Sequence, residues 1–167
     1  NLTLFNVAGE QAIFDGIKEV WASPYTERSF KWRQKYLSNP ENVFPSILVI
    51  PGVNVEYSGV MITKGIRSGI DNDLTVAMSR GAGGAVDGQI AETYLIRMDE
   101  TYDLIAPSRE SKYNYLPKTG GVDKRETAFN ERILDSNGIK VICEMAEMIR
   151  ERMPKAWDGD YDGAYDV

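Results

Sequence analysis

Residues 92–108 read ETYLIRMDETYDLIAPS, two short runs of aliphatic, aromatic and β-branched residues on either side of Asp99 and Glu100. Runs of this length and composition, joined by a few polar residues, predict a β-hairpin, although the connection is not of the Asn-Gly type that tight hairpins favour. A hairpin pairs its strands antiparallel. The stretch therefore predicts an antiparallel sheet, whose other strands have to come from the neighbouring sequence.

Three further strands are predicted upstream of this hairpin. DLTVAMS (73–79) alternates large apolar residues with small or polar ones, which is typical of a half-buried strand. SGVMIT (58–63) and SILVI (46–50) are short apolar runs. SILVI stops at Pro51, which has no N–H to donate to a neighbouring strand.

The two ends of the chain show helical spacing instead. Residues 9–23 predict an amphipathic helix, and Ser23-Pro24 predicts the N-cap and first position of a second helix, which Asn39-Pro40 ends. Apolar residues from Ile139 onward predict a last helix that stops at Pro154. Helices at both ends and strands between them predict an α+β fold with a mainly antiparallel sheet flanked by helices.

The stretch RESKYNYLPKTGGVDKRET (109–127) shows neither the apolar spacing of a helix nor the alternation of a strand, and it contains a Gly-Gly pair. It is therefore predicted to be a long, mobile surface loop. The 167 residues are enough for one hydrophobic core, and nothing reads as a linker. The sequence therefore predicts one domain, residues 1–167.

Composition narrows the classes of function. A net charge of -6 and a pI near 4.8 argue against a nucleic-acid partner, which normally meets a basic face. No apolar run approaches the ~20 residues of a membrane span. The single cysteine, Cys143, lies in an apolar helical run, which predicts a buried, inert thiol and a reducing compartment, the cytoplasm. The chain has no histidine, which removes imidazole bases and the usual zinc ligands.

Three stretches carry candidate site residues. SRGAGGAVDGQ (79–89) matches neither the dinucleotide fingerprint nor a P-loop, and it favours a strand-to-strand turn over a loop that cradles a ligand. VIPGV (49–53) offers backbone groups that a flat heteroaromatic ring can use, although Pro-Gly alone favours a turn. Asp158, Asp160 and Asp162 before Gly163 open a calcium loop, but its twelfth position falls at 169, outside the sequence.

Taken together, these stretches resemble one family, the N-terminal nucleotide-binding region of phosphoenolpyruvate synthase and pyruvate phosphate dikinase, which has an ATP-grasp fold. The similar segments follow the family's order along the whole chain. They are LTLFNVAGEQAIFDGIKEVWASPYTERSFKWR, VIPGVNVEYSGVMIT, AMSRGAGGAVDGQIAETYLI and WDGDYDGAYDV. The resemblance implies that residues 1–167 are one partial domain, the C-terminal part of an ATP-grasp domain truncated at both ends.

The resemblance also implies site residues and cofactors. ATP would be bound with Mg²⁺, and Ile50, Pro51, Gly52 and Val53 would form the hinge against adenine. Gly81 and Gly83 would lie in a loop that contacts the nucleotide. Asp166 matches the first acid of the family's magnesium-binding Asp-Ile/Val-Glu strand, so the aspartate run before it would be a turn.

The implied reaction transfers a phosphoryl group from ATP to a histidine on a separate domain of the same chain, and then to pyruvate. No catalytic residue is expected among these 167, and the isolated piece is expected to be inactive. Gly84 stands where the family has glutamate, and Asp87 is a candidate substitute for it. Three alternatives stay open: a pyruvate phosphate dikinase or another dikinase of the family, a calcium-binding module, and a non-catalytic interaction domain.

Overall fold

The computed structural model describes residues 2–70, 72–84, 91–128 and 131–153. The chain divides into two compact units. The first comprises residues 1–54 and 116–123, and the second comprises residues 55–115 and 124–167. That residues 1–167 form a single partial domain stays a prediction.

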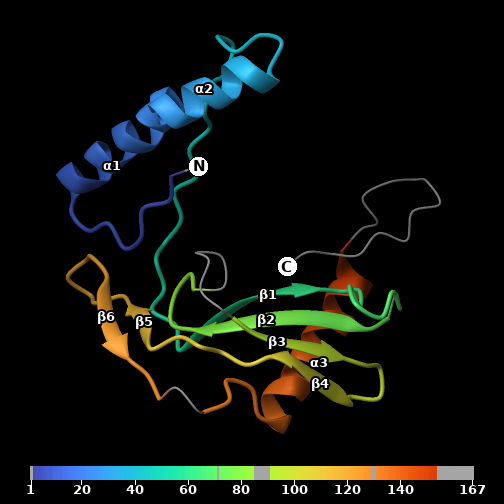
Figure 1. Ribbon diagram of the computed structural model, residues 1–167. Helices are drawn as coiled ribbons and strands as arrows, with labels where there is room; N and C mark the ends of the chain where they lie inside the picture. Colours follow the sequence, from blue (N-terminus) through green and yellow to red (C-terminus); the bar gives the residue numbers. More distant parts are fainter. Residues whose placement is uncertain (1, 71, 85–90, 129–130, 154–167) are drawn as a thin grey trace. The chain divides into compact units, whose positions relative to one another are not determined.

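The second unit is built on a four-stranded sheet. Its strands are β1 (Tyr57–Ile62), β2 (Leu74–Arg80), β3 (Glu92–Ile96) and β4 (Tyr102–Ala106), in the order β1-β2-β3-β4. Every neighbouring pair is antiparallel, with Met61 opposite Val76 and Val76 opposite Tyr94. The α+β class, the mainly antiparallel sheet, the strands predicted at 58–63 and 73–79 and the hairpin predicted at 92–108 are confirmed (Figure 1).

The hairpin between β3 and β4 closes without an Asn-Gly pair. Glu100 takes the left-handed backbone conformation (φ 62°) that such a turn requires. The Asp99 carboxylate accepts from both the backbone N–H and the hydroxyl of Thr101, at 3.0 and 2.6 Å. The side chain of Asp99 thus supplies the local hydrogen bonds that stabilise the turn.

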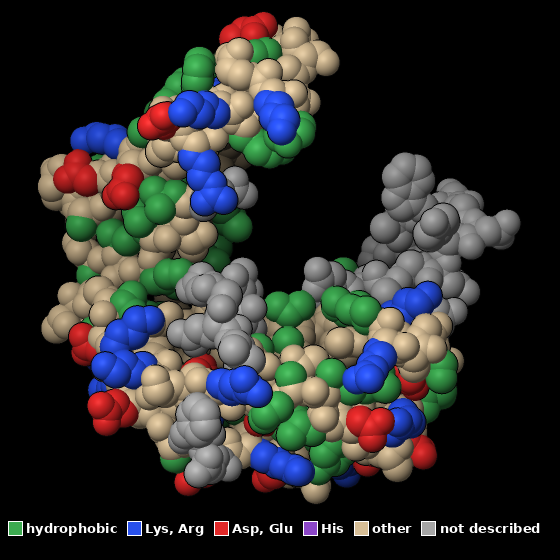
Figure 2. Space-filling view, viewed as in Figure 1, with side chains coloured by type: hydrophobic (Ala, Val, Ile, Leu, Met, Phe, Trp, Pro, Cys, Tyr) green, Lys and Arg blue, Asp and Glu red, His purple; other side chains and the backbone are tan. Residues whose placement is uncertain are grey.

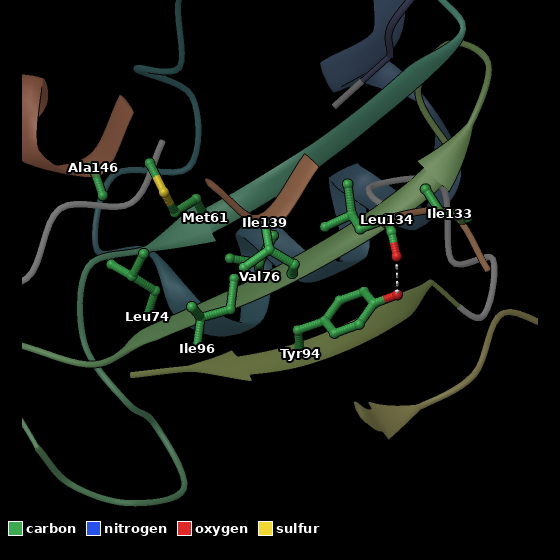
Figure 3. Close-up of a cluster of buried hydrophobic side chains, with 9 residues drawn as sticks. All are labelled: Met61, Leu74, Val76, Tyr94, Ile96, Ile133, Leu134, Ile139 and Ala146. Carbon is green, nitrogen blue, oxygen red and sulfur yellow. Dashed lines mark hydrogen bonds between the residues drawn. The ribbon is translucent and has the colours of Figure 1, made fainter. Parts of the chain in front are cut away.

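Helix α3 (Ser136–Arg152) covers one face of this sheet (Figure 1). Its N-cap is Asp135, whose carboxylate accepts from the N–H of Gly138 at 2.7 Å. Figure 3 shows the core between helix and sheet. The buried residues are Met61, Leu74, Val76, Tyr94, Ile96, Ile133, Leu134, Ile139 and Ala146. The last helix is therefore confirmed, although it begins three residues before Ile139.

Cys143 lies on the inner side of α3, half-buried against this core. Burial raises the pKa of its thiol, so the sulfur stays protonated and uncharged at neutral pH. The thiol is partly rather than fully buried, and its protonated form agrees with the predicted inert role. Met145 and Met153, in contrast, point away from the core and are exposed.

The buried carboxylate of Glu92 joins the sheet to the segment that leads into α3. Glu92 is 2% exposed, and its Oε1 accepts from the N–H of Ile133 at 2.7 Å and from that of Leu134 at 3.4 Å. The same oxygen accepts from the hydroxyl of Tyr94. Burial, reinforced by this neighbouring carboxylate, raises the pKa of Tyr94, which keeps the hydroxyl protonated and able to donate.

The prediction of a mobile loop at 109–127 is wrong. The segment contains β5 (Lys112–Tyr115) and β6 (Asp123–Glu126), which form a separate two-stranded sheet. Its residues are mostly polar, so no apolar alternation marks the strands. They are held by backbone and side-chain bonds instead, including Thr127 N–H to Ser111 O at 3.1 Å and the Arg125 guanidinium over the ring of Tyr115.

The first unit contains α1 (Glu10–Ala22), a 3-10 turn (Ser23–Tyr25) and α2 (Glu27–Tyr36). The first predicted helix is confirmed, but Ser23 is not the N-cap of the second. It ends α1, with its hydroxyl donating to Val20 O at 2.7 Å, and Thr26 is the N-cap of α2. Three residues in 3-10 conformation turn the chain here, so the second α-helix starts later than Pro24 predicts.

The buried side chain of Arg33 connects the segment between the two helices to the turn that follows α2. Its guanidinium donates to Pro24 O at 2.8 Å and to Pro40 O at 3.1 Å, and it lies over the ring of Tyr25. A charged group thus takes the place of an apolar core in this part of the unit, since no residue of α1 is buried.

The strand predicted at 46–50 is also wrong. The structure assigns no regular element to residues 43–55, and Leu48, Val49 and Ile50 are exposed. A β-branched run becomes a strand only where a partner accepts its hydrogen bonds and a packed face covers its side chains. No described residue provides either for this run, so its apolar side chains remain at the surface.

We expect Glu92→Ala to lower the free energy of unfolding by about 3 kcal/mol, because it leaves the buried N–H of Ile133 without its acceptor and leaves the hydroxyl of Tyr94 only the long contact to Leu134 O, at 3.5 Å. Glu92→Gln keeps one acceptor oxygen and should cost less. Urea unfolding followed by far-ultraviolet circular dichroism measures both.

The matched control is Glu144→Ala, at an exposed position of α3, which should change stability by less than about 0.5 kcal/mol. Equal effects of Glu92→Ala and Glu144→Ala would show that Glu92 does not hold the sheet to the helix.

Candidate functional site

The predicted site residues lie in different parts of the molecule. Ile50, Pro51, Gly52 and Val53 belong to the first unit, and Gly81 and Gly83 belong to the second. Asp166, Asp87 and the three aspartates of the calcium-like motif lie outside the described residues.

The segment 50–53 is an open stretch of backbone. Ile50 is 69% exposed and Val53 is 66% exposed, and Pro51 and Gly52 are exposed as well. The structure assigns no turn to these residues, so the simple Pro-Gly turn that the residues alone favour is not what forms here. An exposed, irregular backbone leaves its carbonyl and N–H groups free to face a ligand.

Gly52 has no structural requirement to be glycine. Its φ lies outside the left-handed region, and an added Cβ would meet nothing nearer than Asn6 Oδ1 at 3.6 Å, an ordinary van der Waals distance. Backbone conformation and packing thus accept alanine at this position. Without a side chain at residue 52, a planar group can approach the backbone closely there.

Asn6, which lies beside Gly52, is hydrogen-bonded to a loop more than a hundred positions away, and no sequence pattern predicts this contact. Its Nδ2 donates to Pro117 O at 2.7 Å and to Gly121 O at 2.8 Å, and its backbone oxygen accepts from the N–H of Gly121 at 2.9 Å. Asn54 adds a second tie, because its Oδ1 accepts from the N–H of Leu116 at 2.9 Å. Asn6, segment 50–54 and loop 116–121 thus form one connected cluster, which we call the Asn6 cluster.

Gly81 is explained by packing. Its φ is 68°, and a Cβ there would meet Asn114 O at 2.1 Å, so no side chain fits. Its N–H donates to Glu56 O at 2.8 Å and its carbonyl accepts from the Ser58 hydroxyl at 2.6 Å. The backbone polar groups of Gly81 are therefore engaged within the protein. Gly83 also has positive φ, 78°.

Two buried polar residues that sequence reasoning missed hold the segment around Gly81. Asn114, on β5 and 7% exposed, donates to Ala82 O at 2.9 Å, and its backbone oxygen accepts from the N–H of Ala82 at 3.2 Å. Lys124 donates to Oδ1 of Asn114, which fixes the orientation of that amide. Glu110 accepts from the N–H of Arg80 at 2.8 Å. The small sheet β5–β6 is thus the support of the glycine segment.

A cavity of about 610 Å³ lies beside the N-terminus of α3, lined by Tyr57, Tyr102, Arg132 and residues 133–138. Helix N-termini attract phosphate, but here the carboxylate of Asp135 already accepts from Gly138 N–H. A second negative charge would be repelled, so this cavity is a poor phosphate site.

Within the described part of the chain, no group of three or more histidine, cysteine, aspartate or glutamate side chains is placed so that it could bind a metal ion. Figure 2 shows basic side chains interspersed with acidic ones on the visible face, without a broad basic surface. None of the helices in the described ranges has the length and apolar character of a membrane span.

Comparison with known proteins gives a consistent family. The family model described as "Pyruvate phosphate dikinase, AMP/ATP-binding domain" matches residues 1–161. The probable phosphoenolpyruvate synthase of Archaeoglobus fulgidus is 27% identical over 163 residues, which are 95% of this chain and 22% of that protein. The phosphoenolpyruvate synthase of Pyrococcus furiosus is 27% identical over 176 residues, covering 98% of this chain and 21% of that protein.

A third relative has a different name. The rifampicin phosphotransferase of Bacillus cereus is 26% identical over 151 residues, which are 89% of this chain and 17% of that protein. The chain therefore spans about a fifth of the length of these relatives.

The two glycines should respond differently to alanine. Gly81→Ala should lower the free energy of unfolding by about 2 kcal/mol or more, because it combines a left-handed backbone with a clash against Asn114 O. Gly52→Ala should leave stability unchanged or raise it by about 0.5 kcal/mol, because its conformation suits alanine. Thermal unfolding of both variants measures the contrast, and a similar loss at both positions would contradict it.

Proposed function

Because the chain belongs to the family of the pyruvate phosphate dikinase AMP/ATP-binding domain, we propose that it is the ATP-holding part of an enzyme of the phosphoenolpyruvate synthase type. ATP transfers a phosphoryl group to a histidine on a separate domain of the same protein, and that histidine passes it to pyruvate. AMP is the nucleotide product, because water takes a second phosphoryl group of ATP. The chain contains no histidine, so the phosphorylated residue belongs to another part of the protein.

The observation that carries this proposal is the open segment 50–53 with a glycine that the fold does not require. Adenine presents an exocyclic amine next to a ring nitrogen, a donor beside an acceptor. Pro51 can only accept, through its carbonyl, and is assigned to the amine. The N–H of Gly52 or Val53 is assigned to the ring nitrogen.

The phosphate end is assigned to other residues. Gly83 is proposed to contact the nucleotide through its backbone, whereas Gly81 has its polar groups engaged and would contribute only close backbone approach. Asp166 is proposed as a ligand of Mg²⁺, which screens the phosphate charges and aligns the transferred group. Carboxylate oxygen is a suitable donor for this ion.

The enzymes proposed as alternatives differ in the molecule that finally accepts the phosphoryl group. Two relatives are named phosphoenolpyruvate synthase, which supports pyruvate as the acceptor. In that reaction we propose that water takes the other phosphoryl group. A dikinase would use phosphate in place of water. The relative named rifampicin phosphotransferase supports a third acceptor of different chemistry. Incubating the complete protein with ATP and each acceptor in turn, and following AMP and phosphorylated product, distinguishes them.

The remaining partners follow from this assignment. ATP and pyruvate are the small-molecule partners, the phosphohistidine domain is the protein partner, and the cytoplasm, where both metabolites are available, is the proposed location. The acidic composition supports the absence of a nucleic-acid partner.

Val53→Pro tests the hinge by removing one candidate backbone donor. We expect the KM for ATP of the complete protein to rise about 3- to 10-fold with little change in kcat, since one hydrogen bond to adenine is lost equally in ground and transition states. The control is Val49→Pro, at a residue of the same type and of nearly the same exposure, 65% against 66%. A rise of equal size in both variants would mean that the segment, rather than its contact with adenine, is affected.

Asp166→Asn tests the metal assignment. The neutral amide should weaken Mg²⁺ binding and lower kcat/KM for ATP about 10- to 100-fold, with partial recovery at high Mg²⁺. Asp160→Asn is the control, and it should leave the magnesium dependence unchanged if the aspartate run is a turn. The opposite pattern, with Asp160→Asn abolishing binding of calcium, would favour the calcium-module alternative.

A further inference from the structure

The side-chain amide of Asn6 has a defined orientation. Its Nδ2 lies within 2.8 Å of two carbonyl oxygens, those of Pro117 and Gly121. Carbonyls only accept, so the nitrogen of the amide has to face them and the oxygen has to point elsewhere. The backbone of Asn6 has a φ of 51°, a conformation that asparagine tolerates better than most residues.

The oxygen of this amide faces segment 50–53. Oδ1 lies 3.6 Å from the place where a Cβ of residue 52 would stand. Since residue 52 is glycine, no side chain covers this oxygen from that direction. An acceptor fixed in orientation therefore lies beside the exposed backbone of Pro51 and Gly52, and none of the described residues donates a hydrogen bond to it.

The loop that orients Asn6 is itself held in place. Gly120 N–H donates to Pro117 O at 3.1 Å, and at Gly120 a Cβ would lie 2.6 Å from that of Ala8. Asn54 holds Leu116 from the other end of the loop. The Asn6 cluster thus presents the Oδ1 atom as a rigid group rather than as a freely rotating amide.

On the premise of the proposed function, we infer that Asn6 determines the specificity for adenine, with Oδ1 accepting one hydrogen of the exocyclic amine while the carbonyl of Pro51 accepts the other. A 6-oxo purine carries an acceptor at this position, so two oxygens would face each other. A site that hydrogen-bonds a substrate amine rejects the analogue that lacks it, because the acceptor is left unpaired.

The test compares ATP with inosine triphosphate, which has an oxygen in place of the amine. Dissociation constants of both nucleotides are measured by calorimetry on the complete protein. We expect the wild type to favour ATP at least tenfold. Asn6→Gly keeps the left-handed conformation but removes the amide, and it should reduce this preference about fivefold, as the loss of one hydrogen bond predicts.

Asn54→Ala is the matched control. It removes another asparagine bond of the same cluster, Asn54 Oδ1 to Leu116 N–H, and should weaken both nucleotides alike without changing their ratio. Should Asn6→Gly fail to fold, Gly52→Val replaces it, because a valine side chain would cover Oδ1 and should lower the preference in the same way.

The outcomes separate this inference from its premise. A wild-type protein that binds neither nucleotide overturns the proposed function and this inference with it. A wild type that binds ATP, with an unchanged nucleotide ratio in Asn6→Gly or Gly52→Val, overturns the inference alone. An equal fall of the ratio in Asn54→Ala also overturns it, since the rigidity of the loop would then set the preference.

Discussion

The second unit depends on one buried carboxylate. Glu92 stands at the start of β3, and its Oε1 accepts from the backbone of Ile133 and Leu134 and from the hydroxyl of Tyr94. These bonds hold the segment before α3 against the sheet, which in turn sets where Ile139 and Ala146 enter the core. The Glu92 side chain thereby satisfies the backbone N–H groups of Ile133 and Leu134, which would otherwise be buried without a partner.

The first unit uses polar groups in the same way. Arg33 donates hydrogen bonds to the carbonyls of Pro24 and Pro40 beside its helix, and Asn6 donates to two carbonyls of the loop at 116–121. In both places a side chain with several donors satisfies backbone oxygens that no strand or helix satisfies. These bonds hold the chain at Pro24, Pro40 and the loop at 116–121, where no strand ladder does so.

The two glycine positions show how structure divides a sequence motif into separate roles. Gly81 is required by its backbone conformation and by the approach of Asn114. Neither its backbone conformation nor its packing requires glycine at residue 52, so a function in ligand binding can explain this glycine. Sequence alone presents both as glycines in unusual stretches. Only the positions of neighbouring atoms show that one supports the fold and the other exposes a surface, which is why the proposed adenine contact rests on residue 52.

The sequence by itself determined those helices and strands whose apolar pattern lies within their own residues. Apolar alternation in 73–79, the paired runs in 92–108 and the helical spacing after Ile139 predict β2, the hairpin and α3, because the residues that form each element also carry its pattern. Ordered motifs along the chain likewise indicated the family, which the match over residues 1–161 shows.

Tertiary structure decided what depends on partners distant in sequence. The polar strands β5 and β6 exist through contacts such as Asn114 with Ala82, 32 positions away, and no periodicity announces them. SILVI has the composition of a strand but lacks a partner among the described residues, so it stays irregular. The side chain of Asn6 is oriented by Pro117 and Gly121, more than a hundred positions along the chain. Hydrogen bonds between distant segments form only once the chain has folded, and a linear pattern does not record them.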